Sequence, residues 1–242
     1  MPKKILIVVG TRPEVIKVAP IINELKKNQS DFNVRVCITG QHESMLISAL
    51  EIFQIKPDYN LKIMEPNQTL FSITSKIINK LEAVLEEFSP DLVMVHGDTT
   101  TTLSASIASF YKKIKVAHIE AGLRTSNKYS PYPEEMNRRI TSQIADYNFA
   151  PTKESFNNLL NEGIEKSKII ITGNTVIDAL LQTLNKISND KDLKRKLEAK
   201  LALENFHLNE NKRIVLVTGH RRENFGEKFI NICKAIKDLV IA

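Results

Sequence analysis

Six of the eight glycines in this chain come at the end of a short run of apolar residues. Gly10 follows the run at residues 5–9, and Gly219 follows the run at residues 214–218. The others are Gly40, Gly97, Gly122 and Gly173. Apolar residues in these runs do not alternate with polar ones, which is typical of parallel strands buried on both faces. A glycine after such a strand permits a tight turn and a close approach of ligand to backbone.

Stretches of helical period lie between these runs, so strands and helices alternate along the chain. We expect helices at residues 14–27, 42–53, 69–88, 101–112, 134–146 and 153–162. Residues 146–150 are a weaker strand candidate, and a helical passage over 174–203 precedes the last run and a helix from about residue 227. This alternation predicts an α/β fold with a doubly wound parallel sheet. The late strand predicts a second domain, with residues 1–173 in the first domain and 174–242 as linker helices and the start of the second.

The composition is that of an ordinary globular protein, with 42% apolar and 26% charged residues. The apolar run nearest the N-terminus, residues 5–9, is far shorter than the roughly 20 residues of a membrane span and too short for a signal-peptide core. We therefore expect a cytoplasmic protein without membrane contact. Cys37 and Cys233 lie in apolar runs without metal-ligand spacing, so we expect buried thiols and no metal site.

The net charge of +6 raises the question of nucleic-acid binding. Half of this charge lies within residues 186–213, a mixed stretch of helical period that is typical of a solvated face. The chain has no tryptophan and few aromatic residues among its basic ones, so the stacking platform of a single-strand binder is missing. We expect no nucleic-acid partner.

The turn after the first strand carries two cations, Arg12 and Lys17. A glycine turn that opens a helix offers free N–H groups and a positive dipole end, which together with these cations suit a diphosphate. The turn is neither the dinucleotide fingerprint nor a Walker loop. In the alternative interpretation, Thr11 caps the helix, Pro13 starts it and both cations are solvated.

Carboxylates recur at the ends of later strands, where ligands bind in open α/β sheets. Asp98 and Glu120 each follow a strand, and Glu134 opens a helix after an aromatic turn. Each has a structural alternative, since Asp98 could cap a helix and Glu134 could complement a helix dipole. Three acids at one edge would raise one another's pKa, as proton shuttles require. His220, in a cationic cluster after the last strand, suits a nucleotide diphosphate, although alone it would be a surface or capping histidine.

In their order along the chain, these motifs resemble the non-hydrolysing UDP-N-acetylglucosamine 2-epimerases over nearly the whole sequence. The matching pieces are residues 10–14, 40–42, 96–102, 118–125, 130–138, 172–178 and 218–226. The resemblance implies two Rossmann-like domains in the glycosyltransferase-B arrangement, with a UDP-sugar in the cleft between them. Members of the family are longer, so we expect a C-terminally truncated chain with an incomplete second domain.

The resemblance also implies reversible conversion of UDP-N-acetylglucosamine to UDP-N-acetylmannosamine, by elimination of UDP and its re-addition to a 2-acetamidoglucal. Inversion at C2 needs proton removal from one face and delivery to the other, hence at least two acid/base groups. By resemblance, the catalytic residues are Asp98, Glu120, Glu134 and His220, and the substrate-binding residues are Arg12, Lys17 and Arg138. It further implies an isomerase without cofactor or metal, a homodimer, and a place in surface polysaccharide synthesis.

A second, regulatory UDP-sugar site is implied around Gln41, His42 and Gln68. At Glu43, Ser44 and Asn67 the sequence departs from the family's basic and amide pattern. These departures argue against activation by substrate.

Three alternatives stay open. A hydrolysing relative would trap the same intermediate with water and release N-acetylmannosamine and UDP. A glycosyltransferase could use the same fold, since fold does not fix function. The chain as it stands could also bind without catalysing, because the run at residues 214–217 would lack neighbouring strands.

Overall fold

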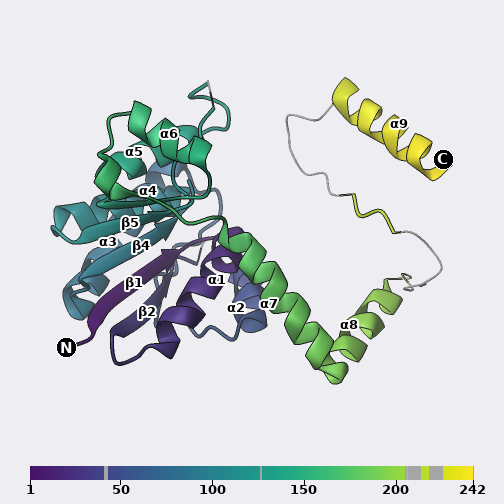
Figure 1. Cartoon of the computed structure of the whole chain (residues 1–242), viewed down its shortest axis with the longest axis horizontal. Helices are drawn as coiled ribbons and strands as arrows, with labels where there is room; N and C mark the ends of the chain where they lie inside the picture. The colour runs from purple at the N-terminus through teal and green to yellow at the C-terminus, as the bar shows by residue number, and fades with distance from the viewer. Residues whose placement is uncertain (41–42, 126, 205, 207–213, 218–225, 242) are drawn as a thin grey trace. The chain divides into compact units, whose positions relative to one another are not determined.

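The computed structural model of the chain describes residues 1–40, 43–125, 127–204, 206, 214–217 and 226–241. Its first compact unit, Met1–Asn189, is built on a seven-stranded sheet with the order β3-β2-β1-β4-β5-β6-β7 (Figure 1). The strands are β1 (Lys3–Val9), β2 (Phe32–Ile38), β3 (Tyr59–Asn60), β4 (Leu92–His96), β5 (Lys115–Ile119), β6 (Tyr147–Ala150) and β7 (Ile169–Ile171). Every pair is parallel, which confirms the expected doubly wound sheet.

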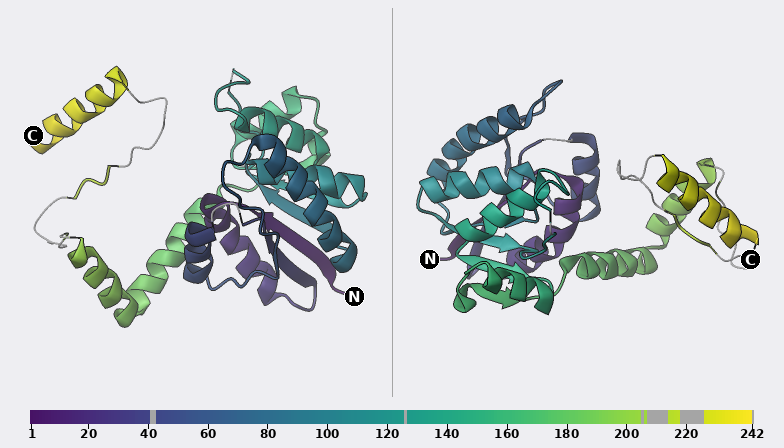
Figure 2. Two further views of the ribbon diagram at one scale, coloured as in Figure 1. Left: turned by 180° about the vertical axis from the view of Figure 1, so that it is seen from behind. Right: turned by 90° about the horizontal axis from the view of Figure 1, so that it is seen from above.

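Helices cover both faces of this sheet, as the three views in Figures 1 and 2 show. The helices of this unit are α1 (Arg12–Lys27), α2 (Glu43–Ile52), α3 (Leu70–Phe88), α4 (Thr100–Tyr111), α5 (Glu134–Ile144), α6 (Lys153–Asn161), the short η1 (Lys166–Lys168) and α7 (Thr175–Asn189). Leu6 and Val8 of β1 pack with α3 and α4, whereas Ile5, Ile7 and Val9 pack with α1 and α2. Successive side chains of a strand point to opposite faces, so burial on both faces explains the unbroken apolar run.

Parallel strands place all their carboxyl ends at one edge of the sheet. The register aligns the end of β1 with that of β2, and β4 with β5, since Val9 pairs with Ile38 and His96 with Ile119. The loops after β1, β4 and β5 therefore meet at this edge, which we call the carboxyl edge. Ligands of open α/β sheets bind at such an edge.

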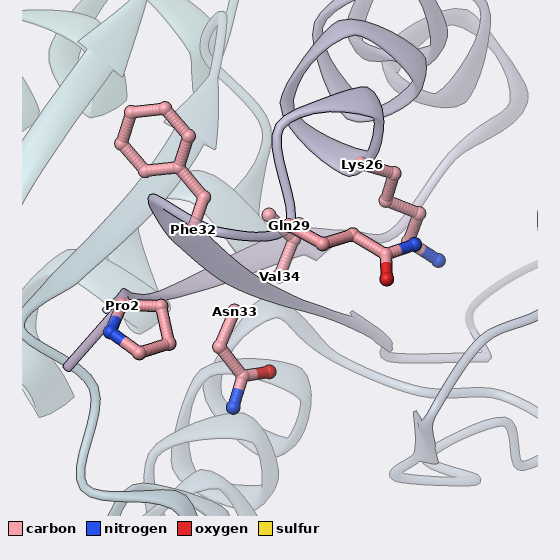
Figure 3. A pocket seen from close by; sticks show the side chains of 6 residues that line it. All are labelled: Pro2, Lys26, Gln29, Phe32, Asn33 and Val34. Carbon is pink, nitrogen blue, oxygen red and sulfur yellow. The ribbon is translucent and has the colours of Figure 1, made fainter.

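The opposite edge, which we call the amino edge, holds a hollow of about 450 Å³ at the start of β1 and β2 (Figure 3). It is lined by Pro2, Lys26, Gln29, Phe32, Asn33 and Val34. Lys26 is its one charged side chain, so the hollow offers no acid/base pair for chemistry.

The second compact unit, Asp190–Ala242, contains α8 (Lys191–Leu203) and α9 (Glu227–Ile241). The expected helical passage over 174–203 is confirmed and consists of two helices, because α7 ends at Asn189 and α8 begins directly after Asp190. The Asp190 carboxylate caps α8 by accepting hydrogen bonds from the backbone N–H groups of Asp192 and Leu193.

The expected strand at residues 214–218 is wrong for residues 214–217, which form no regular structure. A strand is held by hydrogen bonds to a neighbouring strand, and no described residue pairs with this segment. Leu216 is 87% exposed, so an apolar composition alone did not make a buried strand.

The two-residue strand β3 was not predicted, because so short a segment has no periodicity to recognise. Among the described residues, no helix combines the length and the apolar character that crossing a membrane requires.

Candidate functional site at the carboxyl edge

Glu14 ties the turn after β1 to the turn after β4. The side chain is 2% exposed, and its Oε2 accepts hydrogen bonds from the Gly10 N–H (3.0 Å), the Thr11 N–H (2.7 Å) and the Thr11 hydroxyl (2.8 Å). Its Oε1 accepts from the hydroxyls of Thr99 (2.8 Å) and Thr102 (3.2 Å). Burial raises the pKa of Glu14 against the lowering effect of these donors. The carboxylate therefore holds both turns in fixed positions relative to each other.

Gly10 lets these turns approach closely. A Cβ at this position would lie 2.1 Å from the Thr101 hydroxyl and 2.8 Å from the Thr39 hydroxyl. Both distances are shorter than van der Waals contact, and both threonines are fully buried. Only glycine fits where β1 meets the start of α4.

The turn after β4 presents Asp98 beside a capped helix. Thr99 is the cap of α4, since its hydroxyl accepts a hydrogen bond from the Thr102 N–H at 3.1 Å, so the interpretation of Asp98 as the cap is wrong. Arg138 lies 3.3 Å from Asp98 Oδ2. Burial raises the pKa of Asp98, Arg138 opposes this, and the nearby Glu134 and Glu120 raise it further. This environment favours a carboxyl that holds a proton.

Glu120, directly after β5, is held by its backbone and by two neighbouring side chains. Its backbone is left-handed, with φ of 61°, a conformation that costs a non-glycine residue about 1 kcal/mol or more. The Lys17 ammonium donates to both of its oxygens at 2.7 Å, and the Asn174 amide donates to Oε2 at 2.9 Å. The Glu120 side chain is 11% exposed. Lys17, expected as a cation for substrate, is thus bonded to Glu120.

Two buried histidines lie behind these acids. His96 has no hydrogen-bond partner among the described residues for either ring nitrogen, and its Nε2 lies 3.9 Å from Glu120 Oε2. Burial, aided by Lys17, lowers the pKa of His96 to about 3. His118 binds the Gly97 carbonyl (2.7 Å) and the Ser142 hydroxyl (3.2 Å), and burial lowers its pKa to about 4. Both rings are neutral at physiological pH.

The start of α5 supplies the third acid and its support. Glu134 is half-buried and makes no hydrogen bond or ion pair with the described residues. Glu135 is fully buried and accepts hydrogen bonds from Arg138 (2.8 Å), Arg139 (2.7 Å) and the Thr125 N–H (3.1 Å). Glu135 therefore anchors Arg138, whose guanidinium reaches Asp98, and leaves Glu134 free.

Of the remaining predicted site residues, Arg12 and Gln68 lie in the described part of the chain. Arg12 is exposed on the first turn of α1 and makes no contact with a charged or polar partner in the described part of the chain. The Gln68 amide donates to the Ile63 carbonyl, ahead of α3. Gln41, His42 and His220 lie outside the described residues.

Sequence reasoning assigned no site role to Glu14 or to Asn174. Glu14 had a signal, because Thr11 and Glu14 have the spacing of a capping box. Asn174 follows the glycine after β7 and precedes a helix, which is a common capping position. Neither signal reveals the partner across the edge.

Acid/base groups and cations at the ligand-binding edge of a doubly wound sheet define an α/β protein equipped for chemistry on an anionic ligand. The UDP-N-acetylglucosamine 2-epimerase family matches residues 23–242. The UDP-N-acetylglucosamine 2-epimerase of Campylobacter jejuni is 54% identical over 241 residues, covering 100% of this chain and 62% of that relative. The enzyme of that name from Yersinia pestis is 51% identical, covering 98% of this chain and 61% of the relative.

A solved structure gives the same result. The crystal structure of UDP-GlcNAc 2-epimerase from Neisseria meningitidis bound to UDP-GlcNAc matches with a TM-score of 0.89 at 53% identity, covering 98% of this chain and 62% of that one. The chain belongs to the UDP-N-acetylglucosamine 2-epimerase family, and its Rossmann-like sheet of the glycosyltransferase-B type is confirmed. It spans about 62% of the length of these relatives.

Proposed function

We propose that the protein interconverts UDP-N-acetylglucosamine and UDP-N-acetylmannosamine by inverting the configuration at C2. The observation that carries the proposal is the gathering of Asp98, Glu120 and Glu134 at the carboxyl edge in unequal environments. Lys17 donates to both oxygens of Glu120, whereas burial raises the pKa of Asp98. Two carboxyl groups set apart in this way suit a base and an acid. The name shared by the relatives supports this assignment.

In the first half-reaction, UDP leaves the sugar. The C2 hydrogen is not appreciably acidic, so breakage of the C1–oxygen bond leads, and UDP departs with the electron pair. Glu120 then takes the C2 proton, and the electrons of the C–H bond form the C1–C2 double bond of 2-acetamidoglucal. Arg12 holds the charge that builds on UDP, and we assign the same role to His220.

In the second half-reaction, UDP returns. Asp98 gives its proton to C2 from the opposite face, and a phosphate oxygen of UDP bonds to C1. Glu120 ends protonated and Asp98 ends ionised, and exchange with water restores both. Burial raises the pKa of Asp98 and Glu134 adds to this effect, so we assign Glu134 the role of supporting the protonated form of Asp98.

The wider roles of the protein are part of the proposal. We propose a cytoplasmic homodimer that supplies an N-acetylmannosamine donor for surface polysaccharide synthesis. Substrate activation through Gln41, His42 and Gln68 is not proposed, because the neighbouring Glu43 and Ser44 differ from the basic and amide pattern expected there.

Heavy water tests the proposal. Incubation of the protein with UDP-N-acetylglucosamine should place deuterium at C2 of both epimers, because Glu120 and Asp98 exchange with solvent in each turnover. Recovery of protiated sugar alone would refute it. NMR of the products separates the hydrolysing alternative, in which free N-acetylmannosamine accumulates in step with UDP.

A further inference from the structure

We propose that Asn174 is a positioning residue for Glu120, which fixes the carboxylate that acts as base. The inference rests on the proposed function. Asn174 comes directly after Gly173 in the turn that follows β7, 54 residues beyond Glu120 in the chain, and its side chain bonds Glu120 at the carboxyl edge. It therefore joins the base to the first turn of α7.

Both ends of the Asn174 amide are in use, and this determines its orientation. Oδ1 accepts a hydrogen bond from the Val176 backbone N–H at 3.0 Å, as a helix cap does. Because a backbone N–H can only donate, the oxygen must face Val176 and the NH₂ group must face Glu120. Nδ2 donates to Glu120 Oε2 at 2.9 Å. The cap thus dictates that a donor, and not an acceptor, faces the carboxylate.

The donors around Glu120 distinguish its two oxygens. Oε2 accepts from Asn174 and from Lys17, whereas Oε1 accepts from Lys17 alone. Oε1 therefore keeps more free lone-pair capacity and is the oxygen that we assign to the C2 proton. Without Asn174 the carboxylate can turn about its last side-chain bond and exchange the two oxygens.

A further negative charge beside Glu120 would be poorly compensated by the charged and titratable groups around it. Lys17 faces it from α1, His96 from β4, Asp98 from the turn after β4, and His118 from its own strand. Both histidines are neutral and Asp98 is a like charge when ionised, so Lys17 is the cation among these groups. A neutral donor at position 174 adds a hydrogen bond without altering this balance of charge.

Two substitutions separate capping from positioning. Asn174→Ser and Asn174→Asp both keep an oxygen that can accept the Val176 N–H, so both keep the helix cap. The serine removes the donor to Glu120, and the aspartate replaces that donor with a like charge. Asn185→Asp is the matched control, since it puts the same charge on the exposed side of α7, where Asn189 is the one side-chain partner of Asn185 among the described residues.

Steady-state epimerisation across the pH range is the first readout. We expect kcat to fall about 10-fold to 100-fold in Asn174→Ser with a nearly unchanged KM, as loss of a hydrogen bond to a charged group predicts. Asn174→Asp should lose more, and the acid limb of its kcat/KM profile should move to higher pH. Wild-type kcat and an unmoved profile in both variants would reduce Asn174 to a helix cap and overturn the proposal.

Thermal unfolding without substrate is the second readout and does not depend on activity. Near neutral pH, Asn174→Asp should unfold at a lower temperature than Asn174→Ser, and the gap should close as acid protonates the carboxyl groups. Asn185→Asp should show no such gap. Equal Tm values for the two Asn174 variants at neutral pH would overturn the contact. An inactive wild-type protein that still shows the gap would refute the proposed function and leave the contact established.

Discussion

The two edges of the sheet differ sharply although the same strands form both. At the carboxyl edge, buried Glu14 and Glu135 hold their loops, Glu120 lies in a left-handed backbone, and Lys17 reaches it across 103 residues of chain. At the amino edge, the hollow has Lys26 as its single charged side chain. Nearby, Lys3 and Asp91 form an ion pair at 3.6 Å with side chains 72% and 47% exposed.

The difference shows where this fold concentrates its interactions. Helices that follow parallel strands point their N-termini, with free N–H groups and positive dipole ends, at the carboxyl edge. Carboxylates at the carboxyl edge are held by donors and cations in buried positions, whereas Asp91 at the amino edge accepts from the Lys4 N–H and pairs with Lys3 at an exposed position. We therefore expect substitutions at the carboxyl edge to affect activity and stability strongly, and those at the amino edge to have little effect.

The largest effect is expected for Glu120→Gln, which keeps the shape of the side chain and removes the carboxylate that we propose as base. Epimerisation should slow by about 1,000-fold, in the range for loss of general acid–base catalysis. Initial rates followed by NMR would measure it. Glu162→Gln is the control, because it breaks the comparably close ion pair with Arg124 at 2.7 Å without touching the three acids. An equal loss in both variants would mean that ion-pair disruption, and not loss of the base, causes the effect.

Glu14→Ala should have the largest effect on stability. The donors of Gly10, Thr11 and Thr99 lose their acceptor in buried or partly buried positions, whereas the Thr102 hydroxyl still has the His96 carbonyl as acceptor. Each unsatisfied buried donor costs about 1 to 3 kcal/mol before relaxation. We expect the free energy of unfolding in urea to fall by about 3 kcal/mol or more. A fall in the free energy of unfolding no larger than that of an ordinary surface substitution, about 0.5 kcal/mol, would contradict the role of Glu14 in joining the two turns.

His96 should make the protein sensitive to acid. Its folded-state pKa of about 3 lies below the ordinary value of 6.5, so between these values the unfolded chain binds a proton that the folded protein does not. Stability is therefore lost as pH falls through 6.5. Between about pH 7.5 and pH 5, the free energy of unfolding should fall by about 2 kcal/mol less in His96→Leu than in the wild type, as urea unfolding would show. His118 is present in both proteins, and because burial is the largest cause of its lowered pKa and His96 a smaller one, most of its contribution cancels. Equal losses would place the titrating group elsewhere.

The smallest effect is expected at the amino edge. Asn33→Ala removes an exposed side chain with no hydrogen bond in the described structure, so stability should change by about 0.5 kcal/mol or less and the epimerisation rate should not change. Thermal unfolding and the NMR assay measure both. A clear loss of activity in this variant would remove the contrast between the edges.

The fold was largely predictable because its strands are buried on both faces. Ile5 to Val9 read as a strand since every residue finds an apolar layer, three on one face and two on the other. The same reasoning failed at Ile214 to Val217, where apolar side chains are exposed because no described strand lies beside them. Asp190 is a residue type that commonly caps a helix, but the sequence has helical period on both sides of it, so the position of the break was not predicted.

The site was predictable in position but not in its contacts. Residues after each strand had to meet at the carboxyl edge, so Asp98 and Glu120 could be named. That Lys17 is bonded to Glu120, and that Glu135 anchors Arg138, depends on side-chain directions across elements distant in sequence. Charge type and spacing carry no such information.

Helix α1 carries Arg12, Glu14 and Lys17 within its first two turns. The same helix thus carries the exposed Arg12, which we assign to the departing diphosphate, Glu14, which binds the turn that bears Asp98, and Lys17, which is bonded to Glu120. A displacement of α1 therefore moves all three side chains together. Under the proposed function, binding of a diphosphate by Arg12 and orientation of the Glu120 carboxylate are therefore coupled through the position of α1.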